Sequence, residues 1–105
     1  MQLTSYLQDG RLTVALFGEI DHHHAKAYIQ NIDAKIQAYT PKDCVLDFRD
    51  VTFMDSSGIA VVINAMRAMG HINGNLHLSG ITNQTMRVFR ASDIDKIVHI
   101  EETVE

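Results

Sequence analysis

Two stretches near the N-terminus alternate apolar and polar residues with the period of a β-strand. They span residues 3–8 and 11–20, and Asp9-Gly10 between them is a strong signal for a hairpin turn. On the second strand three apolar residues share one face: Leu12, Val14 and Leu16. The opposite face carries Thr13, Ala15 and Phe17. Because this face is also partly apolar, the pattern favours a sheet that is covered on both sides.

The segment after Asp21 has apolar residues at spacings of three and four, which is typical of an amphipathic helix. Asp21 is well suited to cap the N-terminus of this helix, and Pro41 predicts its end. The expected buried stripe consists of Ala25, Tyr28, Ile29, Ile32, Ile36 and Tyr39.

The stretch from Val45 to Met69 organises the rest of the chain, because it predicts a strand, a loop and a helix in series. The strand is expected at about Cys44 to Phe48, and the polar connection at Arg49 to Asp55. An apolar helix then begins at three small residues: Ser56, Ser57 and Gly58.

The helix that begins near Ser56 is apolar over much of its surface. Its expected buried stripe consists of Ile59, Val62, Ile63, Met66 and Met69. Three further residues widen the stripe: Ala60, Val61 and Ala65. We therefore expect this helix to be buried on more than one side, or to present apolar surface to a partner. Gly70 is the expected C-cap.

Strands and helices continue to alternate towards the C-terminus. The pattern predicts a turn at Asn73-Gly74, a strand over 76–79, and a helix over about 83–91 that Thr82 caps. A last short strand is expected from Ile94, Ile97, Val98 and Ile100, followed by an acidic tail over 101–105. This order predicts a single α/β domain with a mostly parallel sheet of about five strands.

Composition narrows the range of partners. The chain of 105 residues has a net charge of −4, and its lysines and arginines are scattered. This argues against a nucleic-acid footprint or a patch for anionic membranes. No apolar run approaches the ~20 residues of a membrane-spanning helix. A single cysteine, Cys44, excludes an internal disulfide, so we expect a buried thiol in a reducing cytoplasm.

The candidate chemistry lies at Ser56. The first turn of a helix offers unpaired N–H groups and the positive end of the helix dipole, which stabilise an anion. Our central hypothesis is that Ser56 accepts a phosphate, with Gly58 keeping the next position small for the approach of a kinase. From the residues alone, Ser56 and Ser57 can also be ordinary helix caps, and so can Asp55.

Two motifs point to a family. One is GEIDHHHA at Gly18 to Ala25, and the other is VTFMDSSGIAVV at Val51 to Val62. Together they resemble the STAS domain, and within it the bacterial anti-sigma factor antagonists. The adjacent histidines after Asp21 are most similar to the branch that controls the sporulation factor sigma-F. The family fold has a mixed sheet with helices mainly on one face.

The resemblance implies a phosphorylation switch in transcription regulation. An anti-sigma factor that is also an ATP-dependent kinase would phosphorylate Ser56, and a PP2C-type phosphatase would reverse the reaction. The unphosphorylated form would bind the anti-sigma factor and free the sigma factor. The partner surface is expected to include Asp21, His22, His23, Asp55, Ser56, Ser57 and Gly58. We expect a cytoplasmic protein with no catalytic residues, metal or cofactor. A monomer is favoured, and the sequence leaves the oligomeric state and nucleotide binding open.

The chain departs from the family pattern near its C-terminus. Family members often carry Ser-Gly-Leu or a similar trio near the last strand, where this chain has Ser92-Asp93-Ile94. Many also continue into a C-terminal helix that residues 101–105 are too few to complete.

Other interpretations remain open at this point. A small hydrolase would use Ser56 or Ser57 as nucleophile with a histidine, although no Gly-x-Ser-x-Gly turn is present. A STAS module in another signalling complex, or one derived from a transporter, is a third possibility. The run His22-His23-His24 is a poor metal site, because adjacent helical residues point ~100° apart. Three further histidines, His71, His77 and His99, are expected to be isolated. The methionines are expected to be mostly core, and for Met54 and Met69 the alternative is a place at the border of an apolar surface.

Overall fold

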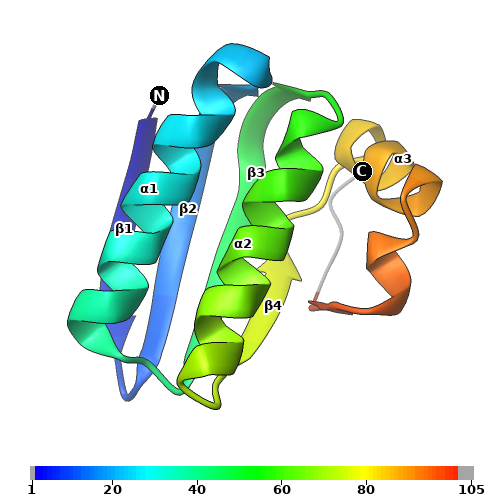
Figure 1. Ribbon diagram of the computed structural model, residues 1–105. Coiled ribbons are helices and arrows are strands. Elements are labelled where there is room, and N and C mark those ends of the chain that lie inside the picture. Colours follow the sequence, from blue (N-terminus) through cyan, green and yellow to red (C-terminus); the bar gives the residue numbers. More distant parts are fainter. Residues whose placement is uncertain (1, 102–105) are drawn as a thin grey trace.

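The strands form one mixed sheet in the order β1-β2-β3-β4-β5 (Figure 1). The computed structural model describes residues 2–101, excluding the side chain of Gln2, so most of the predicted acidic tail lies outside the described residues. β1 is antiparallel to β2, and the remaining neighbours are parallel, as predicted. The strands are β1 (Gln2–Gln8), β2 (Arg11–Ile20), β3 (Asp43–Met54), β4 (Asn75–Ser79) and β5 (His99–Ile100).

The hairpin between β1 and β2 forms at the expected turn. Asp9 and Gly10 have φ values of 54° and 79°, and Gln8 pairs with Arg11. A two-residue turn with two positive φ values matches the right-handed twist of the flanking strands. The Asp-Gly pair therefore fixes the register of the first two strands.

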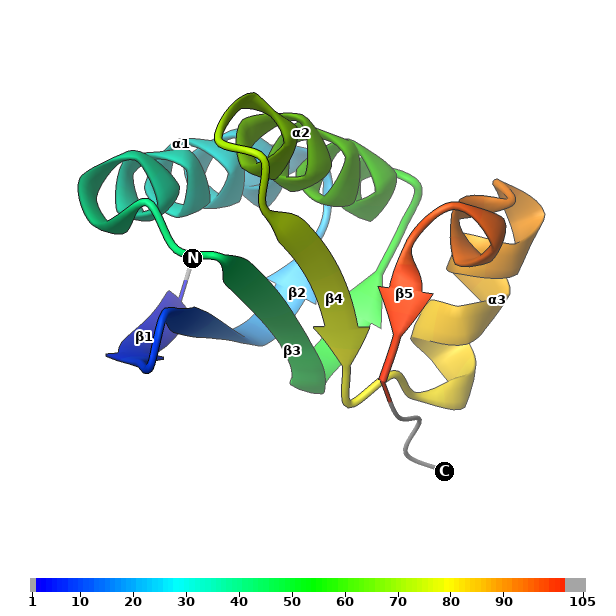
Figure 2. The same cartoon turned by 90° about the horizontal axis from the view of Figure 1, so that it is seen from below.

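Two helices, α1 (His22–Tyr39) and α2 (Ser57–His71), lie side by side over one face of the sheet (Figure 2). Within residues 2–101 no helix covers the opposite face, so the expectation of a sheet covered on both sides is wrong. The third helix, α3 (Asn83–Ala91), packs at the far edge instead, with Phe89 edge-on to Phe48 at 5.4 Å between ring centroids. The one-sided arrangement is the one that the family resemblance predicts.

The core lies between the sheet and the two helices that cover it. Strand residues of this core include Leu12, Val14, Leu16, Leu46 and Leu78, all with no exposed surface. The helices contribute Tyr28, Ile32 and Ile36 from α1 and Val61, Val62 and Met69 from α2. Tyr39 does not belong to the stripe that we predicted for α1, because it is 50% exposed in the last turn of the helix. Met54 and Met69 are both 1% exposed, which confirms them as core residues.

β3 is longer than the sequence suggests. Residues Arg49–Met54, which we expected to be a polar loop, continue the strand and stay paired with β2 as far as Met54, opposite Ile20. Irregularities in the register between the two strands interrupt the simple alternation of polar and apolar residues. This masks the strand in the sequence, although Val51 and Met54 still point into the core.

The buried face of α2 is rotated from the predicted one. It consists of Gly58, Val61, Val62, Ala65 and Met69. Ile59, Ile63 and Met66 are only partly buried, so the helix does present apolar surface beyond the core. Gly70 is not the C-cap, since the helix continues to His71 and the left-handed residue is Asn73, with φ 57°. The turn at Asn73-Gly74 is confirmed, closed by the N–H of Gly74 donating to the carbonyl of Met69.

The C-terminal part is less strand-like than expected. α3 forms over the predicted residues, and Thr82 and Thr85 make a reciprocal capping box at its start. A 3₁₀ helix, η1 (Ile94–Lys96), then replaces the first half of the predicted last strand. Asp93 adopts a left-handed conformation with φ 62°, a region that glycine enters more readily than other residues. None of the helices in residues 2–101 has the length and apolar composition needed to cross a membrane.

Candidate functional site

The N-termini of α1 and α2 meet at one end of the sheet, where the parallel strands β2 and β3 end (Figure 1). Ile20 pairs with Met54, and the backbone N–H of Asp55 donates to the carbonyl of Ile20 at 3.2 Å. Asp21 and Asp55 therefore follow neighbouring strand ends. The parallel pairing thus places these two residues at the same end of the sheet.

Asp21 caps α1, as predicted. Its carboxylate accepts hydrogen bonds from the backbone N–H of His24 at 3.1 Å and from the ring Nδ1 of His24 at 2.6 Å. Partial burial opposes ionisation, but the hydrogen bonds from His24 outweigh it and lower the pKa of Asp21 below its ordinary value of 3.8. His24 is thus bound to Asp21, whereas His22 and His23 are exposed and meet edge to face.

Ser56 lies at the N-terminus of α2 with its side chain exposed. Its hydroxyl makes no capping hydrogen bond. The carboxylate of Asp55 instead accepts a hydrogen bond from the backbone N–H of Ser57 at 2.8 Å, so Asp55 provides the cap. Ser57 takes part in this first turn through its backbone N–H. The exposed Ser56 hydroxyl stands at the positive end of the helix dipole.

Gly58 is buried, and this corrects our reason for a small residue there. A Cβ atom at this position would lie 2.3 Å from Sδ and 2.4 Å from Cγ of Met54. Met54 is itself 1% exposed and cannot move into solvent without opening the core. The absence of a side chain at Gly58 therefore lets α2 sit close to the end of β3, rather than providing space for a kinase.

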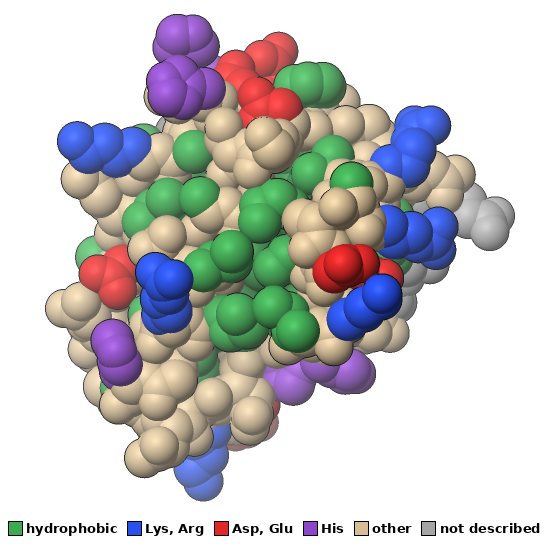
Figure 3. Space-filling model, turned by 45° about the vertical axis from the view of Figure 1, so that its right-hand side comes forward, with side chains coloured by type: hydrophobic (Ala, Val, Ile, Leu, Met, Phe, Trp, Pro, Cys, Tyr) green, Lys and Arg blue, Asp and Glu red, His purple; other side chains and the backbone are tan. Residues whose placement is uncertain are grey.

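A groove of about 590 Å³ separates the first turns of α2 from α3. Its walls are formed by Ser56, Ile59, Gln84, Arg87, Val88, Ala91 and Ser92. In Figure 3, hydrophobic side chains gather across the middle of this face, with lysine and arginine side chains towards its margins. Ser56 thus lies on the edge of a mostly apolar hollow to which Arg87 contributes one cationic side chain.

Gln84 holds α3 against the end of β3. Its side-chain amide donates to the carbonyl of Met54 at 2.8 Å and accepts from the N–H of Met54 at 3.1 Å. The side chain of Gln84 thus bonds to both backbone groups of Met54, as the backbone of a neighbouring strand would. These bonds hold α3, which forms one wall of the groove, to the chain two residues before Ser56. Sequence analysis missed Gln84, because an isolated glutamine in a helix carries no signal of such a contact.

The described residues that line the groove include neither a histidine nor a carboxylate, and the nearest carboxylate to Ser56 along the chain, that of Asp55, is engaged in capping α2. Cys44 does not line the groove. Its side chain is fully buried, and burial raises the pKa of its thiol to about 12. This confirms Cys44 as a core residue.

Two histidines outside this site lie side by side, contrary to our expectation. His77 on β4 and His99 on β5 pair across the sheet, and their Nδ1 atoms are 2.9 Å apart. Sequence analysis treated both as isolated, because 22 positions separate them in the chain.

Comparison with known proteins agrees with this architecture. The family model described as "STAS domain" matches residues 2–105. An anti-sigma F factor antagonist from Paenibacillus polymyxa is 30% identical over 91 residues, which cover 87% of this chain and 78% of the relative. The one from Lysinibacillus sphaericus is 30% identical over 83 residues, covering 79% of this chain and 71% of the relative.

Solved structures show the same fold. The anti-sigma factor antagonist SpoIIAA in its unphosphorylated form superposes with a TM-score of 0.83 at 24% identity, covering 99% of this chain and 90% of that one. The phosphorylated form of SpoIIAA from Bacillus gives 0.74 at 24% identity, covering 99% and 93%. On the family match and the sequence relatives together, this chain belongs to the STAS domain family, and its relatives include anti-sigma factor antagonists.

Proposed function

We propose that this protein is an anti-sigma factor antagonist that phosphorylation of Ser56 switches off. The observation that carries the proposal is the exposed hydroxyl of Ser56, which stands at a helix N-terminus while the neighbouring Asp55 does the capping. A hydroxyl that the fold does not use can be modified without loss of the cap. The names of the relatives, anti-sigma F factor antagonists, support the same role.

The proposed partner is an anti-sigma factor that also acts as a serine kinase. The unphosphorylated surface suits a protein partner, because the apolar groove between α2 and α3 opens directly beside Ser56. The exposed His22 and His23 extend this surface along the start of α1. Binding of the partner here would place its active site over the Ser56 hydroxyl and would free the sigma factor that the partner holds.

Phosphorylation would change the charge of this surface rather than its fold. A phosphate adds a charge of about −1.5 to −2, and the dipole of α2 stabilises it. The same charge would lie beside Asp55 and near Asp21, at the mouth of an apolar groove. A partner surface shaped to a neutral serine would then meet an anion that it must desolvate, so the complex would separate.

In this proposal a PP2C-type phosphatase removes the phosphate from Ser56. The cycle runs in the cytoplasm, and this chain binds no cofactor. Phosphoryl transfer depends mainly on positioning and on charge neutralisation by the kinase and its Mg²⁺. This protein would therefore supply only an accessible, oriented hydroxyl.

Titration calorimetry with the anti-sigma kinase and no ATP tests the proposal. Ser56→Ala removes the acceptor but no charge, so it should bind at about wild-type affinity. Ser56→Asp should weaken binding at least about tenfold, since it adds an uncompensated anion at the interface. Ser57→Asp places the same charge one residue along in the expected partner surface, and it should weaken binding less than Ser56→Asp if the effect is specific to position 56. Equal binding by Ser56→Asp and wild type would refute the charge-exclusion mechanism.

A further inference from the structure

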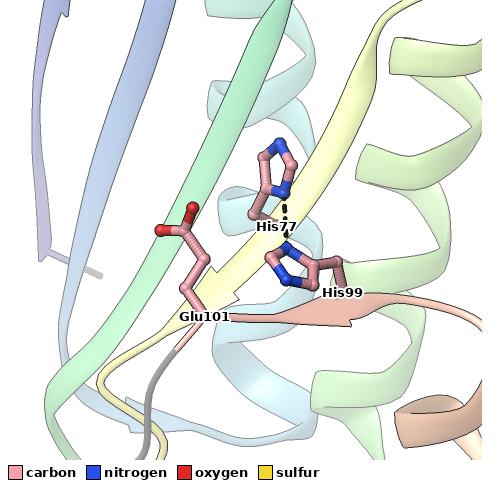
Figure 4. Close-up of side chains that lie close together, drawn as sticks. All are labelled: His77, His99 and Glu101. Carbon is pink, nitrogen blue, oxygen red and sulfur yellow. Dashed lines mark hydrogen bonds between the residues drawn. The ribbon is translucent and has the colours of Figure 1, made fainter.

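The sheet face that the helices leave open carries a cluster of metal-binding side chains. His77 and His99 are register partners on β4 and β5, and the N–H of Glu101 donates to the carbonyl of Leu78 at 2.7 Å. The buried Leu76 and Leu78 point towards the helices, so the intervening His77 points the other way. Figure 4 shows His77, His99 and Glu101 on one side of the sheet, with the helices behind it.

The distances among these side chains suit a single ion. The two Nδ1 atoms are 2.9 Å apart, and one ligand atom from each of His77, His99 and Glu101 lies within 4.8 Å of the others. Two imidazole nitrogens bound to one Zn²⁺ at ~2.05 Å lie ~2.9 to 3.3 Å apart for angles between ~90° and the tetrahedral value. The spacing of the histidine pair therefore fits a shared ion, once the rings rotate to turn both Nδ1 lone pairs from each other towards the ion.

A fourth residue orients His77 for this role. Asp43 on β3 lies 2.8 Å from Nε2 of His77, through its Oδ1 atom. An ionised carboxylate can only accept, so Nε2 carries the proton and Nδ1 of a neutral His77 presents its lone pair towards His99. Metal-binding histidines usually donate their second N–H to a carboxylate or carbonyl in this way. The side chain of His77 is 17% exposed, against 37% for that of Asp43.

We propose that His77, His99 and Glu101 bind a divalent transition-metal ion, with Zn²⁺ the best match, and that Asp43 supports His77 from behind. Two imidazoles and a carboxylate are typical zinc ligands, and three protein ligands leave one position for water or an added group. The site is independent of the function proposed for Ser56, because it lies on the open face of the sheet and not in the groove between α2 and α3.

Metal binding would give the carboxylate of Glu101 a new partner. In the absence of metal, both carboxylate oxygens of Glu101 accept from Arg11, at 2.5 and 2.7 Å. Recruitment of Glu101 to the ion would release Arg11 and add a side-chain link to the existing pairing between β4 and β5. β5 has only two residues in its ladder, so this link would hold the edge of the sheet together more firmly.

Calorimetric titration of tag-free protein with ZnCl₂ tests the site. The expected result is one equivalent of Zn²⁺ bound, with a higher melting temperature when Zn²⁺ is present. His99→Ala removes an exposed ligand and should weaken binding at least about tenfold. Asp43→Asn should weaken it less, because the amide oxygen can still accept from His77. Histidine side-chain NMR should show the ring resonances of His77 and His99 shifting together.

The exposed histidines of α1 provide the matched control. The double variant His22→Ala/His23→Ala removes the same number of imidazoles from another surface and should bind Zn²⁺ as the wild type does. The proposal is overturned if Zn²⁺ does not bind at about 1 mM, if His99→Ala binds it unchanged, or if the α1 variant abolishes binding. None of these outcomes bears on phosphorylation at Ser56, so the two proposals stand or fall separately.

Discussion

The carboxylate of Asp55 accepts a hydrogen bond from the backbone N–H of Ser57 at 2.8 Å, across the exposed Ser56 that lies between them. Asp55 and Ser56 thereby have separate tasks at the start of α2. The aspartate satisfies the helix N-terminus, and the serine keeps its hydroxyl in solvent. A phosphate on the serine would add to the cap rather than replace it.

Loss of the Asp55 cap should destabilise the protein. Asp55→Ala is expected to lower the free energy of unfolding by about 1 kcal/mol, the usual effect of removing a helix cap. Asp55→Asn keeps an acceptor oxygen and should lose less. Urea denaturation of both variants measures the difference. Equal stability of Asp55→Ala and wild type would show that the Asp55–Ser57 bond does not cap α2 in solution.

Two glycines of α2 should respond in opposite directions to alanine. Gly58→Ala places a Cβ atom against Met54 and should cost about 1–3 kcal/mol through overpacking. Gly70→Ala meets no atom within 4 Å and should stabilise the helix by roughly 0.5–1 kcal/mol. Thermal unfolding of the two variants compares them directly. A neutral Gly58→Ala would mean that Met54 can repack, and would remove the packing explanation for this glycine.

The contact between Gln84 and Met54 should control the groove. Gln84→Ala leaves the N–H and carbonyl of Met54 without these partners and should lower stability by about 1–3 kcal/mol. Because α3 would be held less firmly, affinity for the anti-sigma partner should also fall. Thr82→Ala, which weakens the same helix at its cap, serves as a control for general destabilisation. If both variants lose affinity in proportion to stability, Gln84 has no specific part in shaping the groove.

The stability that Asp21 contributes should depend on pH. Hydrogen bonds from His24 lower the pKa of Asp21 in the folded state, so the charged carboxylate binds fewer protons there than in the unfolded chain. Its contribution is present above the unfolded pKa and is lost as the pH falls through the lower folded value. Asp21→Asn should therefore be less stable than wild type at about pH 6, and the gap should narrow towards about pH 3. A gap that does not change over this range would contradict the assignment.

Local signals in the sequence were sufficient for most of the fold. The Asp-Gly turn, the caps at Asp21 and Thr82, and the helical spacing after Asp21 each act within a few residues, and the structure contains all of them. The end of β3 escaped prediction, because irregular pairing with β2 hides its alternation from Arg49 onwards. The buried side of α2 was misjudged because the helix carries apolar side chains on several of its faces. The spacing of these residues alone therefore does not show which face packs against the sheet.

The candidate site was predictable only where its residues are neighbours in sequence. Asp55, Ser56 and Ser57 adjoin one another, and the helix N-terminus that they form can be inferred from spacing. Gln84 reaches this site from 30 positions away, and the pairing of His77 with His99 depends on the order of strands in the sheet. Such contacts between residues far apart in the sequence depend on the tertiary structure, so local patterns do not reveal them.

The most direct test of the central claim is to incubate the protein with its anti-sigma kinase and MgATP and to locate phosphate by peptide mass spectrometry. The account predicts phosphate on Ser56, dissociation of the complex, no phosphate on Ser56→Ala, and normal phosphorylation of Ser57→Ala. Phosphate on Ser57 alone, or a stable complex with no phosphate on Ser56, would contradict the proposed switch.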